Sequence, residues 1–539
     1  MKLLIASLFS LTLLAGFLAA ILLSFLYFFD LIDVPLLFGL TILINLVLWL
    51  LGPTISDWIY RHFYKMRWIS MDELRQLSPA SAAIVTLVCG KYRFRVPRLG
   101  IIPDNNPNAF TYGSGRWNGR VVITEGILKY LDENERASVY GHELGHIKNR
   151  DFIVMTIAST LLQLLYEAFV VTRLFTGKGK KKGGLPVVAI MVAAYVLYWI
   201  GQYVVLYLSR VREYYADEFS ARETDPDYLS SALIKISYGI LVNPDDVRLV
   251  NSTRFIGLTN FKLSEQIGLV YYNCRNVGKF EPLLKTLLYD LKNPWAFVSE
   301  LSSTHPLTGK RLRRLSGFSK HPLFDFRVIE REFPVDKGRM NRNFLRDVAV
   351  VILPVAAAIA FPIVYLAAVY GGWFDPTIGG FLGGWLLLGG VGILVRTLYR
   401  YPGRKPEPGT VIDLMSDLYA SPVRGRPVSL KGKLVGRGVP GLIFSEDMMM
   451  QDSTGLMFVN YESWLPFFGN LFFGLKKVPQ LVNREAAISG WFLRGVSPML
   501  GLGSLETGSE KIRGYVKLGG LIGGTILAVV GILILSFIP

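Results

Sequence analysis

Long apolar runs alternate with polar segments along the chain. An α-helix needs roughly 20 apolar residues to cross the hydrocarbon core of a bilayer. Seven runs reach or approach that length: Leu3–Phe29, Val34–Leu51, Phe152–Phe175, Leu185–Leu208, Val348–Tyr370, Ile378–Val395 and Leu518–Ile538. The pattern therefore predicts a polytopic membrane protein that is mainly α-helical.

The first run shares features with a cleaved leader sequence, namely Lys2, an apolar stretch, and small residues at Ala15 and Gly16. It is longer than the roughly 7–15 apolar residues of a typical leader. No polar cleavage region separates it from the next run. We therefore expect a retained membrane anchor.

The last polar block, residues 401–515, has a different periodicity. Its segments PVSLKGKLVG, GLMFVNY and AAISGWFL read as short alternating strands, and Gly and Pro residues separate them. This pattern predicts a small closed β-domain of the OB type, and other β-barrels fit it as well.

The basic residues indicate an orientation in the membrane. The formal charge of +17 would by itself suit a nucleic-acid-binding protein. The basic residues gather beside the apolar runs, however, as the positive-inside rule predicts for cytoplasmic ends. They include Arg61, Lys65, Arg67, Arg339, Arg342, Arg346, Arg396, Arg400, Arg404 and Lys405. We expect no nucleic-acid partner, and we expect the large polar segments in the cytoplasm.

Three loops bear on this orientation. FDLIDVP and GGWFDPT, after the first and fifth runs, contain no Lys or Arg and are expected outside. The loop TGKGKKKGG (Thr176–Gly184) would also fall outside, although it contains four lysines. Either its hairpin does not fully cross the membrane or the rule fails locally.

The two cysteines, Cys89 and Cys274, lie far apart and have no C-x-x-C spacing. This excludes a cysteine metal cluster and provides no disulfide framework. A cytoplasmic location of the polar segments agrees with such cysteine usage.

The stretch GHELGHIKNRD (Gly141–Asp151) contains the first candidate for chemistry. Asp132 and Glu135 form a capping-box signature that predicts a helix from about Glu133 through His146. Residues four apart share a helical face, so His142 and His146 can direct imidazole nitrogens at one metal ion. Glu143 can then reach a water bound to that metal. Two histidines that cap a helix at the membrane surface are the alternative.

A third ligand is expected from SRVREYYADEFSARE, which follows the fourth run. Glu213 and Asp217 are four apart, and the hairpin returns this segment to the side where the histidine motif lies. Glu213 can complete a His2Glu zinc site, which leaves one position open for water. Asp217 can accept a hydrogen bond from a ligand histidine. An exposed acidic helix face is the alternative.

A further candidate segment is SSTHPLTGKRLRRL (Ser302–Leu315). His305 can donate a hydrogen bond to the oxyanion that forms when water attacks a peptide carbonyl. Arg311 can anchor a substrate backbone or neutralise the acidic residues. A turn followed by a basic surface helix is the alternative.

These motifs, in this order, resemble the membrane zinc metalloproteases of the HtpX type and their relatives, the CAAX prenyl endopeptidases. The matching elements are HELGH at 142–146, REYYAD at 212–217, STHP with Arg311, and NAF at Asn108–Phe110. The resemblance covers about Leu3 to Leu315. The chain departs from the family in reading HPL where HPP is common, and in its Gly-rich hairpin loop.

The resemblance implies roles for particular residues. It implies that His142, His146 and Glu213 bind one zinc ion and that Glu143 is the general base. His305 and Arg311 would border the substrate. The strand RVVIT (Arg120–Thr124) would be the edge strand to which an extended peptide adds, with Asn108 and Ala109 close by.

We therefore expect a multi-pass protein of the cell membrane with a zincin-like metalloprotease domain and an OB-like domain, both cytoplasmic. The expected parts are residues 1–51 (two transmembrane helices), 52–347 (the metalloprotease domain, interrupted by a transmembrane hairpin at 152–208), 348–396 (a transmembrane hairpin), 401–515 (the OB-like domain) and 517–538 (a transmembrane helix). The expected activity is zinc-dependent cleavage of membrane or membrane-associated proteins, in quality control or processing. The sequence leaves the substrate and the oligomeric state open.

Two other functions fit parts of the sequence. Intramembrane site-two proteases also combine H-E-x-x-H with a later acidic ligand, for which NPDD (Asn243–Asp246) is a candidate. That motif lies in a polar stretch, whereas its carboxylate would have to reach a metal inside the membrane. A non-catalytic membrane scaffold or sensor that acts through its β-domain is the second alternative, although the motif lacks none of the expected residues.

Overall fold

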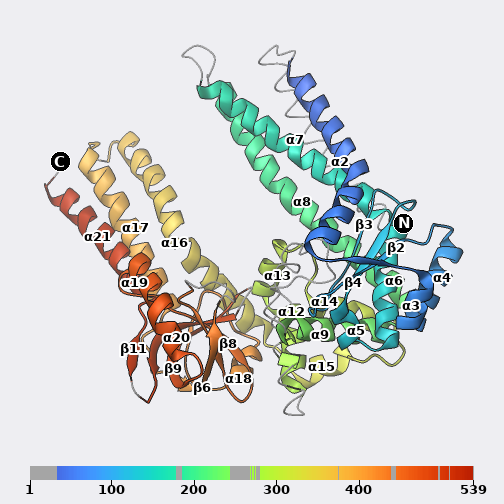
Figure 1. Cartoon of the computed structure of the whole chain (residues 1–539). Coiled ribbons are helices and arrows are strands. Elements are labelled where there is room, and N and C mark those ends of the chain that lie inside the picture. The colour runs from blue at the N-terminus through green and yellow to red at the C-terminus, as the bar shows by residue number, and fades with distance from the viewer. Residues whose placement is uncertain are drawn as a thin grey trace. The chain divides into compact units, whose positions relative to one another are not determined.

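The computed structural model describes residues 33–177, 185–242, 267–268, 270–271, 274, 280–373, 375–438, 445–495, 498–508 and 510–537. The chain forms two compact units (Figure 1). Unit 1 comprises Met1–Gly268 and Val298–Ile329, and unit 2 comprises Leu269–Phe297 and Glu330–Pro539. The first apolar run, the lysines of the hairpin loop and the NPDD motif lie outside the described residues.

Six of the described helices are long and apolar enough to cross a membrane. They are α2 (Asp33–Phe63), α7 (Asp151–Gly177), α8 (Leu185–Glu223), α16 (Lys337–Tyr370), α17 (Ile378–Arg400) and α21 (Leu518–Phe537). All six fall on predicted apolar runs. Helix α8 continues without a break from its apolar half into the acidic motif around Glu213. The protein is a multi-pass membrane protein.

Shorter helices and strands make up the rest of the described part of unit 1. They are β1 (Arg67–Ile69), α3 (Met71–Leu77), α4 (Pro79–Tyr92), β2 (Arg98–Ile102), β3 (Ala109–Tyr112), β4 (Arg120–Thr124), α5 (Glu125–Tyr130), α6 (Glu133–Asn149), α9 (Pro226–Val242) and α14 (Thr308–Ser316). Helices α13 (Pro294–Leu301) and α15 (Phe326–Glu332) each cross the boundary between the units.

The sheet of unit 1 corrects one prediction. Its strand order is β1-β2-β4-β3, with β2 and β4 parallel and β3 antiparallel to β4; Figure 1 labels β2, β3 and β4. The RVVIT segment is strand β4, which was predicted at the edge, and it lies inside the sheet. The chain folds back so that β3, with the NAF segment, covers the other side of β4, where Phe110 pairs with Val122. The edge strand on that side is β3.

The predicted capping box on α6 is confirmed. The Asp132 side chain accepts from the backbone N–H of Glu135, and the Glu135 side chain accepts from that of Asp132. This satisfies two backbone donors that the first turn of a helix leaves unpaired. The helix ends at Asn149, its C-cap Arg150 is in the left-handed conformation with φ of 60°, and α7 begins at the residue after that.

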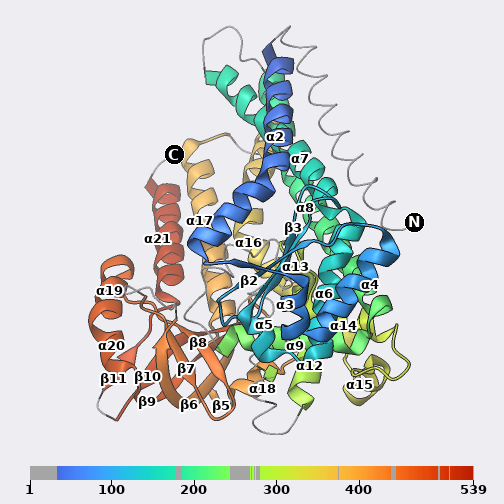
Figure 2. The same ribbon diagram turned by 45° about the vertical axis from the view of Figure 1, so that its right-hand side comes forward.

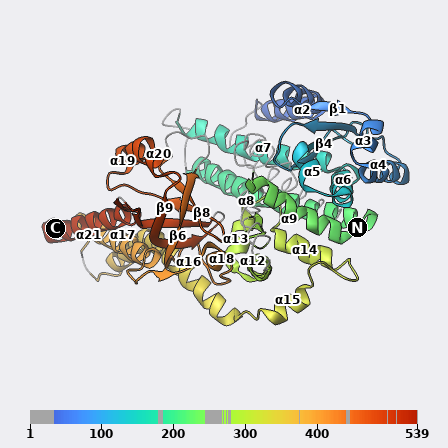
Figure 3. The same ribbon diagram turned by 60° about the horizontal axis from the view of Figure 1, so that its bottom comes forward.

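Unit 2 contains a C-terminal β-barrel. Its elements are α12 (Glu281–Lys292), β5 (Glu407–Pro408), α18 (Val411–Met415), β6 (Arg426–Arg437), β7 (Met448–Gln451), β8 (Leu456–Asn460), α19 (Pro466–Phe472), the π-helix η1 (Phe473–Lys477), α20 (Val478–Leu481), β9 (Glu485–Arg494), β10 (Pro498–Glu506) and β11 (Lys511–Arg513), with the spans α16, α17 and α21. Strand β9 pairs with both β10 and β6, which closes the ring β6-β7-β8-β10-β9. Figure 2 labels all five strands, and Figure 3 shows β6, β8 and β9 from another side. Within this ring only β8 and β10 are parallel.

The membrane helices α17 and α21 approach each other at glycines. A Cβ atom on Gly390 would lie 2.5 Å from the backbone nitrogen of Ala528, and one on Gly531 would lie 2.5 Å from that of Leu387. Small residues let membrane helices pack backbone to backbone, where van der Waals contact replaces the hydrophobic effect. The pair depends on these glycines because backbone atoms cannot move aside.

Replacing Gly390 with leucine is expected to destabilise unit 2. The side chain would force α17 and α21 apart, and overpacking of this kind costs about 1–3 kcal/mol. Gly389→Leu is the matched control, because no atom lies within 4 Å of a Cβ atom at that position. The measurement is thermal unfolding of the full chain in detergent. Equal melting temperatures for the two variants would contradict the packing.

Candidate metal centre

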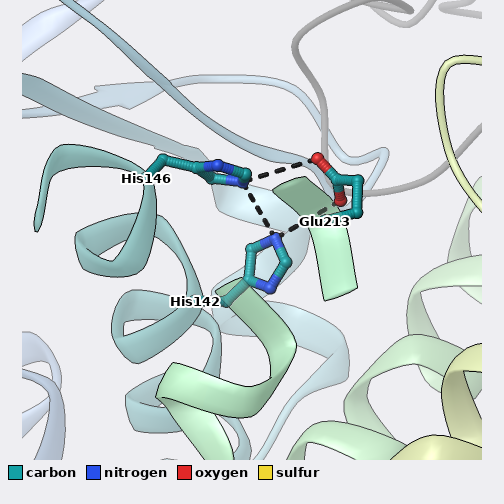
Figure 4. Close-up of side chains that lie close together, drawn as sticks. All are labelled: His142, His146 and Glu213. Atoms are coloured by element: carbon teal, nitrogen blue, oxygen red, sulfur yellow. Dashed lines mark hydrogen bonds and ion pairs between the residues drawn. The ribbon is translucent and has the colours of Figure 1, made fainter. Parts of the chain in front are cut away.

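Two helices bring three metal-ligating side chains together. His142 and His146 come from α6, and Glu213 comes from α8 (Figure 4). The two histidine Nε2 atoms lie 3.2 Å apart. Glu213 Oε2 is 3.5 Å from His142 Nε2, and Glu213 Oε1 is 3.5 Å from His146 Nε2. Each histidine nitrogen thus faces one oxygen of the Glu213 carboxylate.

Close packing of α6 on α8 makes this group possible. A Cβ atom on Gly145 would lie 3.1 Å from Ala216 Cα, and one on Gly141 would lie 3.1 Å from Ser220 Oγ. The Ser220 hydroxyl also donates to the carbonyl of Ser138 on α6, at 2.6 Å. The glycine inside HELGH therefore lets the backbone of α8 come close enough for its carboxylate to reach both histidines.

A carboxylate lies next to the Nδ1 atom of each histidine, on the side of the ring away from Glu213. His142 Nδ1 lies 3.0 Å from Asp217 Oδ1, and His146 Nδ1 lies 2.6 Å from Asp151 Oδ2. Such contacts fix the ring orientation and the tautomer that leaves the other nitrogen free to bind a metal. Arg212 in turn forms an ion pair with Asp151. Both Nε2 atoms are thus directed at Glu213.

Arg311 on α14 neutralises the acidic side of the cluster. It donates two hydrogen bonds to Asp217, from Nε at 2.8 Å and from its terminal nitrogen at 2.6 Å, and it lies 3.8 Å from Glu213 Oε2. Arg311 and Asp217 are each 1% exposed. Buried charges are tolerated when they are paired and hydrogen-bonded, as in this bidentate contact.

Burial shapes the proton affinities of the cluster. Burial lowers the pKa of His142, but the nearby carboxylates of Asp217 and Glu213 outweigh it and raise the pKa to about 9. Burial raises the pKa of the Glu143 carboxyl above its ordinary value, although His142 and His146 oppose the shift. A glutamate with a raised pKa is suited to accept a proton near neutral pH.

The donor atoms fit a zinc ion. Ligand atoms bound about 2.0–2.1 Å from a tetrahedral zinc lie roughly 3.3 Å from one another. The two histidine nitrogens are 3.2 Å apart, and each lies 3.5 Å from one of the two Glu213 oxygens, which is close to this separation. Glu213 Oε2 is also buried without a hydrogen-bond partner, which an ion at the centre would supply. Two imidazoles and one carboxylate form a common donor set for catalytic zinc.

The other predicted residues lie around this group. His305 Nε2 is 3.6 Å from Glu213 Oε1, and His305 Nδ1 is 2.9 Å from the hydroxyl of Thr304. The turn that holds His305 is fixed by Arg210, which donates to the carbonyls of Glu300 and Ser303. The structure therefore brings His305 and Arg311 beside the metal-ligating group.

The predicted pair Asn108 and Ala109 lies at the start of the edge strand. The backbone N–H of Asn108 donates to Thr124 Oγ1 at 2.8 Å, and its carbonyl accepts from the backbone N–H of Thr124. Two residues further along the same strand, Thr111 donates a hydrogen bond to Glu143 Oε2. Strand β3, which contains most of the NAF segment, is thus joined through Thr111 to the helix of the metal centre.

Three residues of the site were not predicted: Thr111, Asp151 and Arg212. Asp151 closes the stretch that contains the histidines, but its contact depends on the left-handed turn at Arg150. Arg212 precedes Glu213 in sequence. No sequence signal marks Thr111, because its contact with Glu143 joins a strand to a helix across 32 positions.

Replacing Thr111 with valine is expected to lower kcat of peptide cleavage and leave KM nearly unchanged. The variant keeps the side-chain shape but removes the hydroxyl that orients Glu143. A hydrogen bond to a charged group contributes about 1.5–3 kcal/mol, which corresponds to roughly 10–100-fold in rate. Thr111→Ser is the matched control and should retain most of the activity. A valine variant as fast as the serine variant would rule out the positioning role.

The helical membrane fold and the buried His2Glu group define a membrane metallopeptidase. Residues 91–319 match the model described as Peptidase family M48. A Protease HtpX homolog of Thermoplasma acidophilum is 30% identical over 277 residues, which cover 51% of this chain and 82% of that protein. The chain belongs to peptidase family M48.

Two further comparisons cover a smaller share of this chain. A Protease HtpX homolog of Methanothermobacter thermautotrophicus is 39% identical over 160 residues, which cover 30% of this chain and 59% of that protein. The solved structure of Ste24p from S. mikatae aligns with 44% of this chain and 59% of its own, at 20% identity and a TM-score of 0.31. Residues after 319, including the β-barrel, lie outside the matched family range.

Proposed function

We propose that the protein is a zinc-dependent endopeptidase that cleaves membrane or membrane-associated proteins, in quality control or processing. The observation that supports this most strongly is the spacing of the His142, His146 and Glu213 donor atoms, with Glu143 next to the first of them. These three residues would hold one zinc ion.

The roles of the side chains follow from their positions. When bound, zinc would polarise the scissile carbonyl and lower the pKa of a water towards ~7. Glu143 removes a proton from the attacking water and passes it to the leaving amine. His305 donates a hydrogen bond to the oxyanion of the tetrahedral intermediate. Asp217 and Asp151 keep the two histidine rings in place.

The substrate peptide is proposed to bind in extended form along β3. Strand β3 has a partner on one side only among the described strands of its sheet. A peptide can add to such an edge through main-chain hydrogen bonds. Asn108 and Ala109 then lie beside the peptide, and the hydrogen bond from Thr111 holds Glu143 next to this strand.

The finer architecture is also part of the proposal. The metal-bearing α6, preceded by the sheet and followed by α8, supports a zincin-like domain within residues 52–347. The ring order β6-β7-β8-β10-β9, with its one parallel pair and its helices between β8 and β9, supports an OB-like barrel. Basic residues beside the spans support a cytoplasmic location for both.

A site-two type of intramembrane protease is the second candidate, and the position of α6 disfavours it. Helix α6 is not among the candidate membrane spans, and α7 begins at Asp151, after the histidines. A metal held by α6 therefore belongs at the end of a span. A scaffold without catalysis is disfavoured because no ligand or base is missing.

Mapping the cleaved bonds in a membrane-protein substrate tests this proposal. The full chain, reconstituted with an unfolded membrane protein, is expected to cut in polar segments next to spans. Addition of 1,10-phenanthroline should abolish cleavage, and added zinc should restore it, because the metal is required. Cuts confined to the interior of spans would favour the site-two mechanism. No cleavage with zinc present would favour the scaffold.

A further inference from the structure

A patch of exposed aromatic and aliphatic side chains lies on unit 2, outside the metal centre. It is formed by the start of the helical stretch between β8 and β9. Its members, all between 42% and 76% exposed, are Trp464, Leu465, Phe467, Phe468, Phe472 and Leu475, the aromatic patch. Soluble surfaces rarely expose so many large apolar groups together, so such a patch marks an interaction site.

The barrel fixes the patch in this outward position. The opposite face of the helical stretch packs inward, where Val478 and Leu481 are fully buried. The Tyr461 ring stacks on Phe473, with ring centroids 3.7 Å apart. The backbone N–H of Ser463 donates to the Asn470 side chain at 2.7 Å. The patch cannot turn inward without breaking these contacts.

A backbone hydrogen bond holds the aromatic patch close to the start of the last span, α21. The backbone N–H of Tyr515 donates to the carbonyl of Glu462 at 2.8 Å. Glu462 stands two residues before Trp464, and Tyr515 stands three residues before α21. Figures 1 and 2 show α19 at the end of the barrel nearest α21.

The connection to the preceding span meets the barrel at the same end. The indole N–H of Trp491 donates to the carbonyl of Pro402, two residues after α17 ends, at 2.8 Å. The ammonium of Lys517, just before α21, lies 5.4 Å from the centre of the Trp491 ring. Both span connections therefore leave the barrel where the aromatic patch lies.

The charge of this region suits a lipid surface. No Asp or Glu occurs between Ser463 and Arg484, and Lys476 follows Phe473 by three residues. The next residue, Lys477, pairs with Glu510 at 2.8 Å, so Lys476 is the lysine offered to the headgroups. The Lys476 ammonium lies 4.6 Å from the centre of the Phe472 ring. Aromatic side chains beside lysines are typical of segments that lie in the membrane interface, where the lysines meet anionic headgroups.

From these observations we infer that the aromatic patch inserts into the leaflet at which α17 ends and α21 begins. Phe467 is 76% exposed, which exceeds the 56% of Ile526, a side chain on the membrane helix α21. Lipid accounts for the exposure of Ile526, and the Tyr515–Glu462 hydrogen bond holds the patch beside the start of that helix. The barrel is thus held to the membrane by two spans and by an interfacial segment, which fixes its face towards the bilayer. This inference is independent of the proposed peptidase mechanism.

Spin labels on the full chain in lipid nanodiscs test the inference. Phe468→Cys carries the label, because both native cysteines, Cys89 and Cys274, are buried. Ser453→Cys is the control, because Ser453 lies in an exposed turn. The neighbouring Asp452 accepts a hydrogen bond from the backbone N–H of Val411 on α18. Figures 1 and 2 show α18 at the end of the barrel away from α19. Collision with oxygen and with a water-soluble nickel chelate reports the depth of each label.

The label at Phe468→Cys is expected to be reached by oxygen and shielded from nickel, at a depth of roughly 5–10 Å below the headgroups. The control label should be open to nickel. Shielding of the Phe468→Cys label from both reagents would overturn the inference and indicate a protein partner or a second copy of the chain. Free access of nickel would show that water covers the patch. Phe472→Cys replaces the first variant if that one fails to fold.

Discussion

Replacing Glu143 with glutamine is expected to abolish peptide-bond cleavage while zinc binding is retained. Glutamine keeps the shape of the side chain but cannot accept the proton of the attacking water. General base catalysis typically contributes about 10²–10⁴-fold in rate, so at least this loss in kcat is expected. Because Glu143 is not one of the three clustered donors, the zinc content should stay at one ion per chain. The measurement is kcat on a peptide substrate, together with the zinc content of the purified variant.

Glu133→Gln is the matched control for this variant. Glu133 lies on the same helix, but its side chain is 42% exposed and pairs with Arg136. Removal of this carboxylate charge should leave the rate of peptide cleavage near that of the wild type. A Glu143→Gln variant that cuts as fast as this control would show that another group accepts the proton.

Replacing Arg311 with methionine is expected to weaken both the fold of unit 1 and its affinity for zinc. The substitution leaves Asp217 buried without its bidentate partner. Breaking a buried ion pair costs about 3–5 kcal/mol. Because Asp217 also holds His142, zinc affinity should fall roughly 10–100-fold, as for other groups that support metal ligands. Thermal unfolding and zinc titration of the full chain measure the two effects.

Arg314→Met is the control for Arg311→Met. Arg314 lies on the same helix, pairs with Glu218 at 3.2 Å and is 39% exposed. Exposed pairs of this kind contribute about 0–1 kcal/mol. Equal loss of stability and zinc affinity in both variants would mean that Arg311 acts only as one basic residue among several on the helix.

The sequence predicted those parts of the fold that depend on local patterns. The apolar runs gave the six described membrane helices, because span length follows from bilayer thickness alone. The capping box gave the start of α6, since Asp132 and Glu135 interact within one turn. The proximity of His142 and His146 follows from helical spacing, and the hairpin α7–α8 explains why Glu213 reaches them.

What the sequence could not predict depends on contacts between distant segments. Strand β4 was taken for the edge strand, because its five residues contain no signal for which neighbour covers each side. The contact of Thr111 with Glu143 and that of Arg311 with Asp217 join residues 32 and 94 positions apart. The closed ring of the barrel depends on pairing of β9 with both β6 and β10, which alternation alone does not specify.

Zinc bound to the wild-type chain and to two substituted chains tests the central claim most directly. X-ray absorption at the zinc edge is expected to show one ion per wild-type chain with two imidazole ligands and a carboxylate. His146→Ala and Glu213→Ala should each lose most of the zinc, whereas Glu143→Gln should retain it with the same ligand set. Wild-type zinc content retained in His146→Ala and in Glu213→Ala would contradict a centre formed by His142, His146 and Glu213.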